Sequence, residues 1–381
     1  MEEKKVDVDI AYLPPEIIRN ILKRLPVKSL VRFHCVSKEW RNLFKTQSFI
    51  GDHLEHSNHQ NPGLLFQCFD GSDLLNLYCL DSEMQVWEFP KPPLHDYRKP
   101  DKIVGSCNGL LCVQINDPHV APHPLLVWNP SIREVRLVPA INFHQDYEDY
   151  NIGFGFSSII NDYKIVIACN SQCYTEISAV QVYSLIAGSW KEVKFCLNCT
   201  ECLSDDSVTL NGVMFWLGSK RVGKDTDDDE VQIVSFDLAN EVFTSIAIPK
   251  LHLWTTLTVY EEKLAIVSCM TKSELSVVDL WVMEEGVHAS GEIWSWTKRY
   301  TSNPYPCWLY PQTIWRNEIV CTADIENKPT AVLVNPTTKR IKKHVISKCD
   351  CGPDILNYSE SLVPVGGMKS LQVFCMASTH P

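Results

Sequence analysis

The stretch Gly-Ser-Cys-Asn-Gly at residues 105–109 has the Gly-x-Cys-x-Gly form of a nucleophile elbow, in which Cys107 would attack a substrate. An elbow needs a strand followed directly by a helix. The next residues are Leu-Leu-Cys-Val, which is typical of another strand. We therefore predict that Asn108 and Gly109 form a two-residue hairpin turn and that Cys107 is not catalytic.

Three closely spaced cysteines could bind a metal. Cys196, Cys199 and Cys202 form a C-x2-C-x2-C pattern that suits zinc or an iron–sulfur cluster. A fourth cysteine is missing nearby, and only the distant pair Cys349 and Cys351 could complete the set. We predict ordinary loop or strand thiols, with no metal site and no cofactor.

Composition and charge exclude several classes of protein. The chain has 381 residues, 45% of them apolar, and a net charge of −11, so it is expected to fold and to repel nucleic acid. It shows neither a secretory signal nor an apolar run that could cross a membrane. The 16 cysteines are scattered, which favours reduced thiols and a cytoplasmic or nuclear location, or both.

The negative charge is concentrated after residue 60. Residues 1–60 carry 10 basic and 8 acidic groups, a balance of +2, which leaves −13 for the remainder. The acidic run from Asp225 to Glu230 is expected to be a solvated loop, and Asp227, Asp228 and Asp229 are candidate contacts for a basic target. Other candidate loops run from 144 to 151, from 196 to 206 and from 286 to 292.

Three short helices are predicted between Leu13 and about Phe49. Pro14 suits the start of a helix, and Leu13, Ile17 and Ile21 recur at i, i+4 and i+8 to form one apolar stripe. Pro26 ends that helix. A unit of about 40 residues buries too small a fraction of its surface to be more than marginally stable, so it needs a partner.

The order and spacing of these residues resemble the F-box motif, especially its plant form. The match covers about residues 11–50 and rests on Leu-Pro-Pro-Glu at 13–16, Leu-Pro-Val-Lys-Ser-Leu at 25–30 and Val-Ser-Lys at 36–38. In that family the helices dock on a Skp-type adaptor, which links to a cullin and a ubiquitin-conjugating enzyme. The resemblance implies an adaptor surface and supporting core made of Leu13, Pro14, Ile17, Ile21, Leu25, Pro26, Leu30 and Trp40. The alternative is that the stripe packs on the rest of this chain.

A repeat of about 51 residues fills the chain after Pro62. Each unit has an apolar strand, a polar turn and an anchor residue that starts a further strand. The anchors, 45 to 55 residues apart, are Trp87, Val135, Trp190, Phe243, Trp296 and Ile341. This period is the length of a four-stranded blade, so we predict a β-propeller of about six blades of the kelch kind. A pair of β-sandwiches is the structural alternative.

The ends of the repeat region predict how the ring closes. The first unit, from Gly63 to Phe89, offers only three strands, whereas Glu360 to Val365 supplies a surplus strand after the sixth unit. Pairing this strand into the first blade would remove an open sheet edge.

Several strings in the repeats resemble the F-box-associated region of plant F-box/kelch-like proteins. They lie at residues 105–112, 127–130, 153–156 and 358–363. Together the two resemblances imply a mainly β protein with a small α N-terminal module. The expected parts are a flexible N-terminus at 1–10, a helical F-box domain at 11–55, a linker at 56–62 and a propeller at 63–381. Three histidines in and near this linker, at 53, 56 and 59, are read as solvated rather than metal-binding.

The resemblance implies a substrate-recognition subunit of an SCF-type (Skp–cullin–F-box) ubiquitin ligase. The F-box would dock a Skp-type adaptor, and through it a cullin, while the propeller would bind a target protein for degradation. We expect a non-enzymatic receptor without a nucleic-acid or membrane partner. The alternative is a propeller scaffold that binds an adaptor without ubiquitin transfer.

Overall fold

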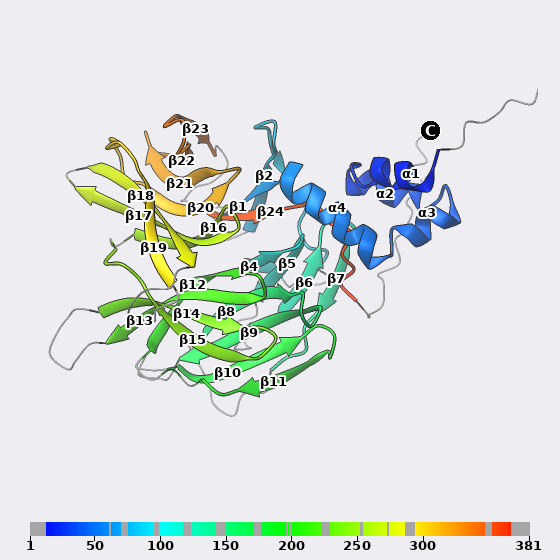
Figure 1. The fold of residues 1–381 in the computed structure, drawn as a ribbon, viewed down its shortest axis with the longest axis horizontal. Coiled ribbons are helices and arrows are strands. Elements are labelled where there is room, and N and C mark those ends of the chain that lie inside the picture. The colour runs from blue at the N-terminus through cyan, green and yellow to red at the C-terminus, as the bar shows by residue number, and fades with distance from the viewer. Residues whose placement is uncertain are drawn as a thin grey trace, which may run out of the picture.

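The structure of the chain is a computed structural model. It describes residues 13–60, 62–69, 75–94, 99–116, 123–141, 150–170, 177–195, 197, 200–221, 229–251, 254–272, 274–285, 294–346 and 353–366. Figure 1 shows a cluster of helices beside a ring of small sheets.

The described chain begins with four helices, which we call the helical module. They are α1 (Pro15–Leu22), α2 (Val27–Phe33), α3 (Lys38–Leu43) and α4 (Gln47–Gln60). Pro14 and Pro26 stand at the N-caps of α1 and α2, and the Ser37 hydroxyl accepts a hydrogen bond of 3.1 Å from the backbone N–H of Glu39 to cap α3. No helix among the described residues is long and apolar enough to cross a membrane.

Helix α4 corrects the prediction of a solvated linker at residues 56–62. The helix continues to Gln60, and both His53 and Ser57 are buried. The ring Nε2 of His53 lies 3.0 Å from the carbonyl oxygen of Leu25, and the Asp52 carboxylate accepts a 2.7 Å hydrogen bond from Arg19. This polar sequence therefore forms a helix that completes the module, because Asp52 and the Nε2 of His53 contact Arg19 and Leu25 of the preceding helical segment.

Six four-stranded antiparallel sheets follow in the described residues and form the blades of a β-propeller. Blade 1 contains β24 (Asp354–Tyr358), β1 (Gly63–Phe69), β2 (Leu75–Leu80) and β3 (Val86–Glu88); blade 2 contains β4 (Lys99–Cys107), β5 (Leu110–Asn116), β6 (Leu125–Asn129) and β7 (Glu134–Leu137); blade 3 contains β8 (Tyr150–Ser157), β9 (Asp162–Asn170), β10 (Ile177–Ser184) and β11 (Ser189–Val193). Blade 4 contains β12 (Thr200–Leu210), β13 (Val213–Arg221), β14 (Asp229–Asp237) and β15 (Val242–Ala247); blade 5 contains β16 (Trp254–Tyr260), β17 (Lys263–Lys272), β18 (Leu275–Glu285) and β19 (Trp294–Thr301); blade 6 contains β20 (Tyr310–Trp315), β21 (Glu318–Ile325), β22 (Lys328–Val334) and β23 (Ile341–Val345). All six predicted anchors lie on the outermost strands, which confirms the repeat.

The ring closes through an earlier C-terminal segment than the sequence predicted. Strand β24 pairs antiparallel with β1, so that Leu356 lies opposite Leu65, and it supplies the fourth strand of blade 1. The prediction that Glu360 to Val365 forms this strand is wrong. Residues 359–365, which we call the C-terminal strap, instead leave the sheet and run between blade 2 and the helical module.

The hairpin turn at Asn108 and Gly109 is confirmed. Both residues have positive φ, 52° and 76°, and the flanking Cys107 and Leu110 pair across the turn. A Cβ on Gly109 would lie 2.5 Å from the backbone oxygen of Ser359 and from the Cβ of Ser361. Glycine is needed here both for its backbone conformation and because the strap crosses directly over the turn.

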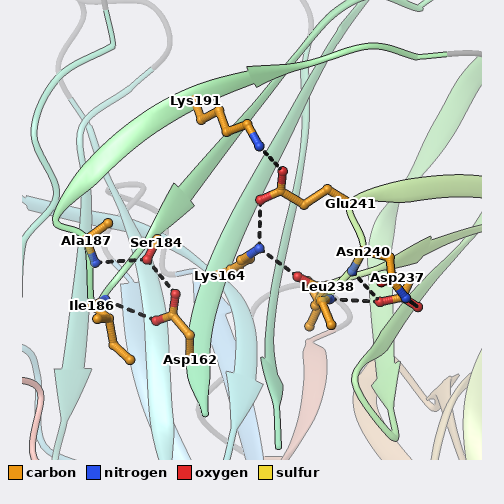
Figure 2. A network of polar contacts seen from close by, with 11 residues as sticks. Asp162, Lys164, Ser184, Ile186, Ala187, Lys191, Asp237, Leu238, Asn240 and Glu241 are labelled. Atoms are coloured by element: carbon orange, nitrogen blue, oxygen red, sulfur yellow. Dashed lines mark hydrogen bonds and ion pairs between the residues drawn. The ribbon is translucent and has the colours of Figure 1, made fainter. Parts of the chain in front are cut away.

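Buried cations tie the turns of neighbouring blades together. In Figure 2 the ammonium of Lys164 in blade 3 donates to the carbonyl oxygen of Leu238 at 2.6 Å and to the Glu241 carboxylate at 2.8 Å, both in blade 4. Arg136 of blade 2 donates to the carbonyl oxygen of Leu185 in blade 3 at 2.6 Å. These bonds satisfy turn carbonyls that packing hides from water, so the junctions are held by polar contacts as well as apolar ones.

Truncation distinguishes the closing strand from the strap. A chain that ends at Pro353 loses both and leaves β1 with an unpaired edge, so we expect its melting temperature to fall by more than about 5 °C or the chain to aggregate. A chain that ends at Ser359 keeps β24 and should melt between this variant and the full-length protein. Thermal unfolding followed by circular dichroism measures all three. Equal melting of the 353 variant and the full-length chain would show that β24 does not close the ring.

Candidate functional sites

The helical module presents an apolar stripe to solvent. Leu13, Ile17 and Ile21 expose 48%, 46% and 48% of their surface, and Pro14 is exposed beside them. Ile17 and Ile21 are about one turn apart on the same face of α1, and Leu13 lies just before the N-cap residue Pro14. The alternative expectation, that the stripe packs on the rest of this chain, is contradicted by this exposure. An exposed stripe on a folded module is a candidate protein-binding surface.

The opposite side of the module is its core. Leu22, Val27, Leu30, Phe44 and Phe49 are buried there. Among the remaining predicted site residues, Leu25 and Trp40 are half-buried and pack against this core, whereas Pro26 is exposed. Of the eight predicted residues, Leu25, Leu30 and Trp40 thus belong to the core, and the other five are exposed.

The C-terminal strap joins the module to the propeller. The Glu360 carboxylate accepts a hydrogen bond of 3.1 Å from the backbone N–H of Val27 at the start of α2, and Leu362 is buried in the module core. On the other side, the amide of Asn129 in blade 2 donates to the carbonyl oxygens of Ser361 and Val363, at 3.1 and 2.8 Å. Sequence reasoning missed this role because an apolar Leu-Val-Pro-Val run was read as a strand.

Cys107 lies in a poor environment for a nucleophile. It ends β4 at the hairpin turn, and burial raises the pKa of its thiol to about 12. A thiol with this pKa is protonated at neutral pH, whereas the thiolate is the reactive form. The site therefore fits the predicted turn and offers no activated cysteine.

The metal pattern finds little support in the described residues. Cys202 lies in β12, where its sulfur is 3.0 Å from the hydroxyl oxygen of Ser219, and the described part of the chain contains no group of three potential ligands. Cys196, Cys199, Cys349 and Cys351 lie outside the described residues. Cys79, Cys112 and Cys321 have reduced thiols, as predicted, but Cys68 is disulfide-bonded and departs from that prediction.

The acidic candidate loop is only partly described. Asp227 and Asp228 lie outside the described residues, while Asp229 is the first residue of β14, paired with Arg221, and is not in a loop. In the candidate loop 144–151, residues 144–149 also lie outside them, whereas Tyr150 and Asn151 belong to β8. The candidate loop 286–292 lies outside the described residues as well. Residues 200–206, expected in a loop, belong to the long strand β12.

Two hollows in the propeller were not predicted. A channel of about 210 Å³ at the centre of the ring is lined by the inner strands, with polar groups such as Thr258, Gln312 and Asn357. A groove of about 1610 Å³ lies between blades 4 and 5. The central channel follows from the ring of blades, whereas the groove depends on how far apart the sheets of blades 4 and 5 lie.

The two sides of the helical module should respond differently to truncation. Leu30→Ala leaves a cavity in the core and should lower the free energy of unfolding by about 2–5 kcal/mol. Ile17→Ala removes an exposed side chain and should change it by less than about 0.5 kcal/mol. Urea unfolding followed by far-ultraviolet circular dichroism reports mainly on the helices. Equal destabilisation by the two variants would contradict the division into surface and core.

The buried thiol predicts slow chemical labelling of Cys107. Because its raised pKa keeps it protonated, iodoacetamide at neutral pH should modify the exposed Cys35 far faster than Cys107, and denaturant should abolish the difference. Peptide mass spectrometry measures both sites in one sample. Rapid labelling of native Cys107 would reveal an activated thiol.

Comparisons with known proteins match both parts of the chain. The F-box domain model matches residues 10–50, and the model of the F-box associated beta propeller domain matches residues 74–365. A putative F-box/kelch-repeat protein of Arabidopsis thaliana is 24% identical over 93% of this chain and 98% of its own length. A putative F-box only protein of the same plant is 25% identical over 76% of each chain.

The exposed helical stripe, the six blades and these matches agree with the family resemblance seen in the sequence. The chain belongs to the F-box proteins that carry an F-box-associated β-propeller.

Proposed function

We propose that this protein is the substrate-recognition subunit of an SCF-type ubiquitin ligase. The observation that carries the proposal is the exposure of Leu13, Ile17 and Ile21 on a module whose other face is already packed. Burying a large aliphatic side chain contributes about 1.5–3 kcal/mol, so covering three that are now nearly half exposed is a substantial gain. A Skp-type adaptor, the general partner of F-box domains, is the protein that would cover them, and a cullin would join through it.

In this proposal the propeller holds a target protein and the receptor itself is not catalytic. A ubiquitin ligase must keep its target at a suitable distance from the conjugating enzyme. The bonds from Val27 to Glu360 and from Asn129 to the strap favour a fixed orientation of module and propeller. The chain would act in the cytoplasm or the nucleus, where its partners would be found.

Adaptor binding should depend on the apolar stripe. The double variant Ile17→Ser with Ile21→Ser should weaken capture of a Skp-type adaptor at least about tenfold, because buried anchors commonly contribute about 2 kcal/mol or more. Leu13→Ala with Pro14→Ala should act in the same direction. Titration of purified adaptor against the full chain, by calorimetry or surface plasmon resonance, measures the effect.

A matched control is present on the propeller. Ile159 and Ile160 are exposed in the turn between β8 and β9, so Ile159→Ser with Ile160→Ser makes the same chemical change away from the module. We expect this control to bind adaptor normally. Unchanged adaptor binding by the stripe variant would remove the assignment, and normal binding without cullin recruitment or ubiquitin transfer to a captured target would favour a scaffold instead.

A further inference from the structure

One junction between blades buries fewer apolar side chains than the other five. Among the described residues, blades 4 and 5 share a cluster of five buried apolar residues, Phe215, Ile233, Leu257, Leu264 and Ile266, and the other apolar residues packed against it, such as Ile248 and Trp281, are only partly buried. The clusters at the other five junctions each contain 11 to 15. The groove of about 1610 Å³ lies at this weak junction.

The walls of the groove are apolar and partly open to water. Ile246 and Met283 line it and are only partly buried, and Val242 and Trp294 at its rim are exposed. An apolar hollow whose walls are incompletely covered by the described residues gains free energy when a partner displaces the water.

A sheet edge runs along one wall. Strand β15 is the outermost strand of blade 4 and has β14 as its one neighbour among the described strands. Its residues 244–247 line the groove. An edge strand offers unpaired backbone groups to another extended chain. At the far end, the indole N–H of Trp296 donates to the carbonyl oxygen of Ala247 at 3.0 Å, which ties blade 5 to the end of this edge.

The charged lining of the groove is acidic. Among the described lining residues it contains Asp237, Glu262 and Glu284 against one cation, Lys263, which is ion-paired with Glu284. Burial acts to raise the pKa of Asp237, but hydrogen bonds from Asn240 and Ala239 outweigh it and lower that pKa, so the carboxylate is charged at neutral pH. Lys164, outside the groove, also lowers the pKa of Asp237. Among the described lining residues, Glu262 is therefore the carboxylate without an opposing cation.

We propose that this groove binds an extended segment of the target protein, in which apolar residues alternate with polar ones and at least one residue is Lys or Arg. The segment adds as a strand to the edge of β15, its apolar side chains pack on Ile246 and Met283, and its cation lies near Glu262. The inference rests on the proposed function and specifies the class of target that the receptor accepts.

A peptide array tests this assignment. The probes are extended peptides of about six residues, the usual length of a strand, in which Val and Leu alternate with Ser and one position is Arg, Ser or Glu. They are exposed to the full chain in complex with a Skp-type adaptor. We expect binding in the order Arg, Ser, Glu, and Glu262→Arg should reverse the preference between Arg and Glu.

A pair of equivalent positions supplies the matched control. Val242 and Ile341 are the first residues of the outermost strands of blades 4 and 6, and they expose 53% and 41% of their surface. Val242→Lys adds a like charge to the cation of the peptide and should weaken binding at least about tenfold. Ile341→Lys lies outside the groove and should change binding by less than about twofold.

The outcomes separate the groove from the ligase assignment. Normal adaptor capture with no peptide selection, or with equal effects of Val242→Lys and Ile341→Lys, would overturn the groove proposal and leave the proposed function standing. Failure of the unaltered chain to capture adaptor would overturn the proposed function and, with it, the inference that rests on it.

Discussion

The pairing of β24 with β1 is the interaction on which the rest of the structure depends. It joins residues almost 300 positions apart, Leu65 and Leu356 among them, and turns six separate sheets into a closed ring. Without it, blade 1 would lack its inner strand and expose the edge of β1, which is a site for aggregation. Closure also fixes where the chain leaves the ring, and so determines the start of the C-terminal strap.

The C-terminal strap connects the closed ring to the helical module. Once β24 is in place, the next residues must pass over the Asn108–Gly109 turn, where only glycine leaves room for Ser361. They then bond to Asn129 on one side and to Val27 on the other. A helical module too small to be stable alone thereby gains buried area from Leu362 of the strap and Ile132 of blade 2. The module remains apolar on its outer face, where a partner can bind.

All six junctions lie between four-stranded sheets, but they bury different numbers of apolar side chains. Buried residues such as Trp128, Trp216 and Trp315 fill the well-sealed junctions, and the cations Arg136 and Lys164 strengthen two of them. Between blades 4 and 5 the apolar residues are present but incompletely covered. A ring that is rigid elsewhere can hold such a groove open without collapse, because closure constrains the spacing of all six blades at once.

Local pattern and composition determined much of this protein. Proline positions and helical spacing predicted α1 to α3, the recurring anchors predicted six blades, and the Asn-Gly pair predicted the hairpin, because these features depend on interactions between residues close in sequence. Tertiary structure decided the features that depend on distant partners. Helix α4 is polar in sequence and is stabilised by contacts with Arg19 and Leu25, and the strap resembles a strand but finds its partners in Asn129 and α2. The groove between blades 4 and 5 depends on the distance between two sheets, which no single repeat encodes.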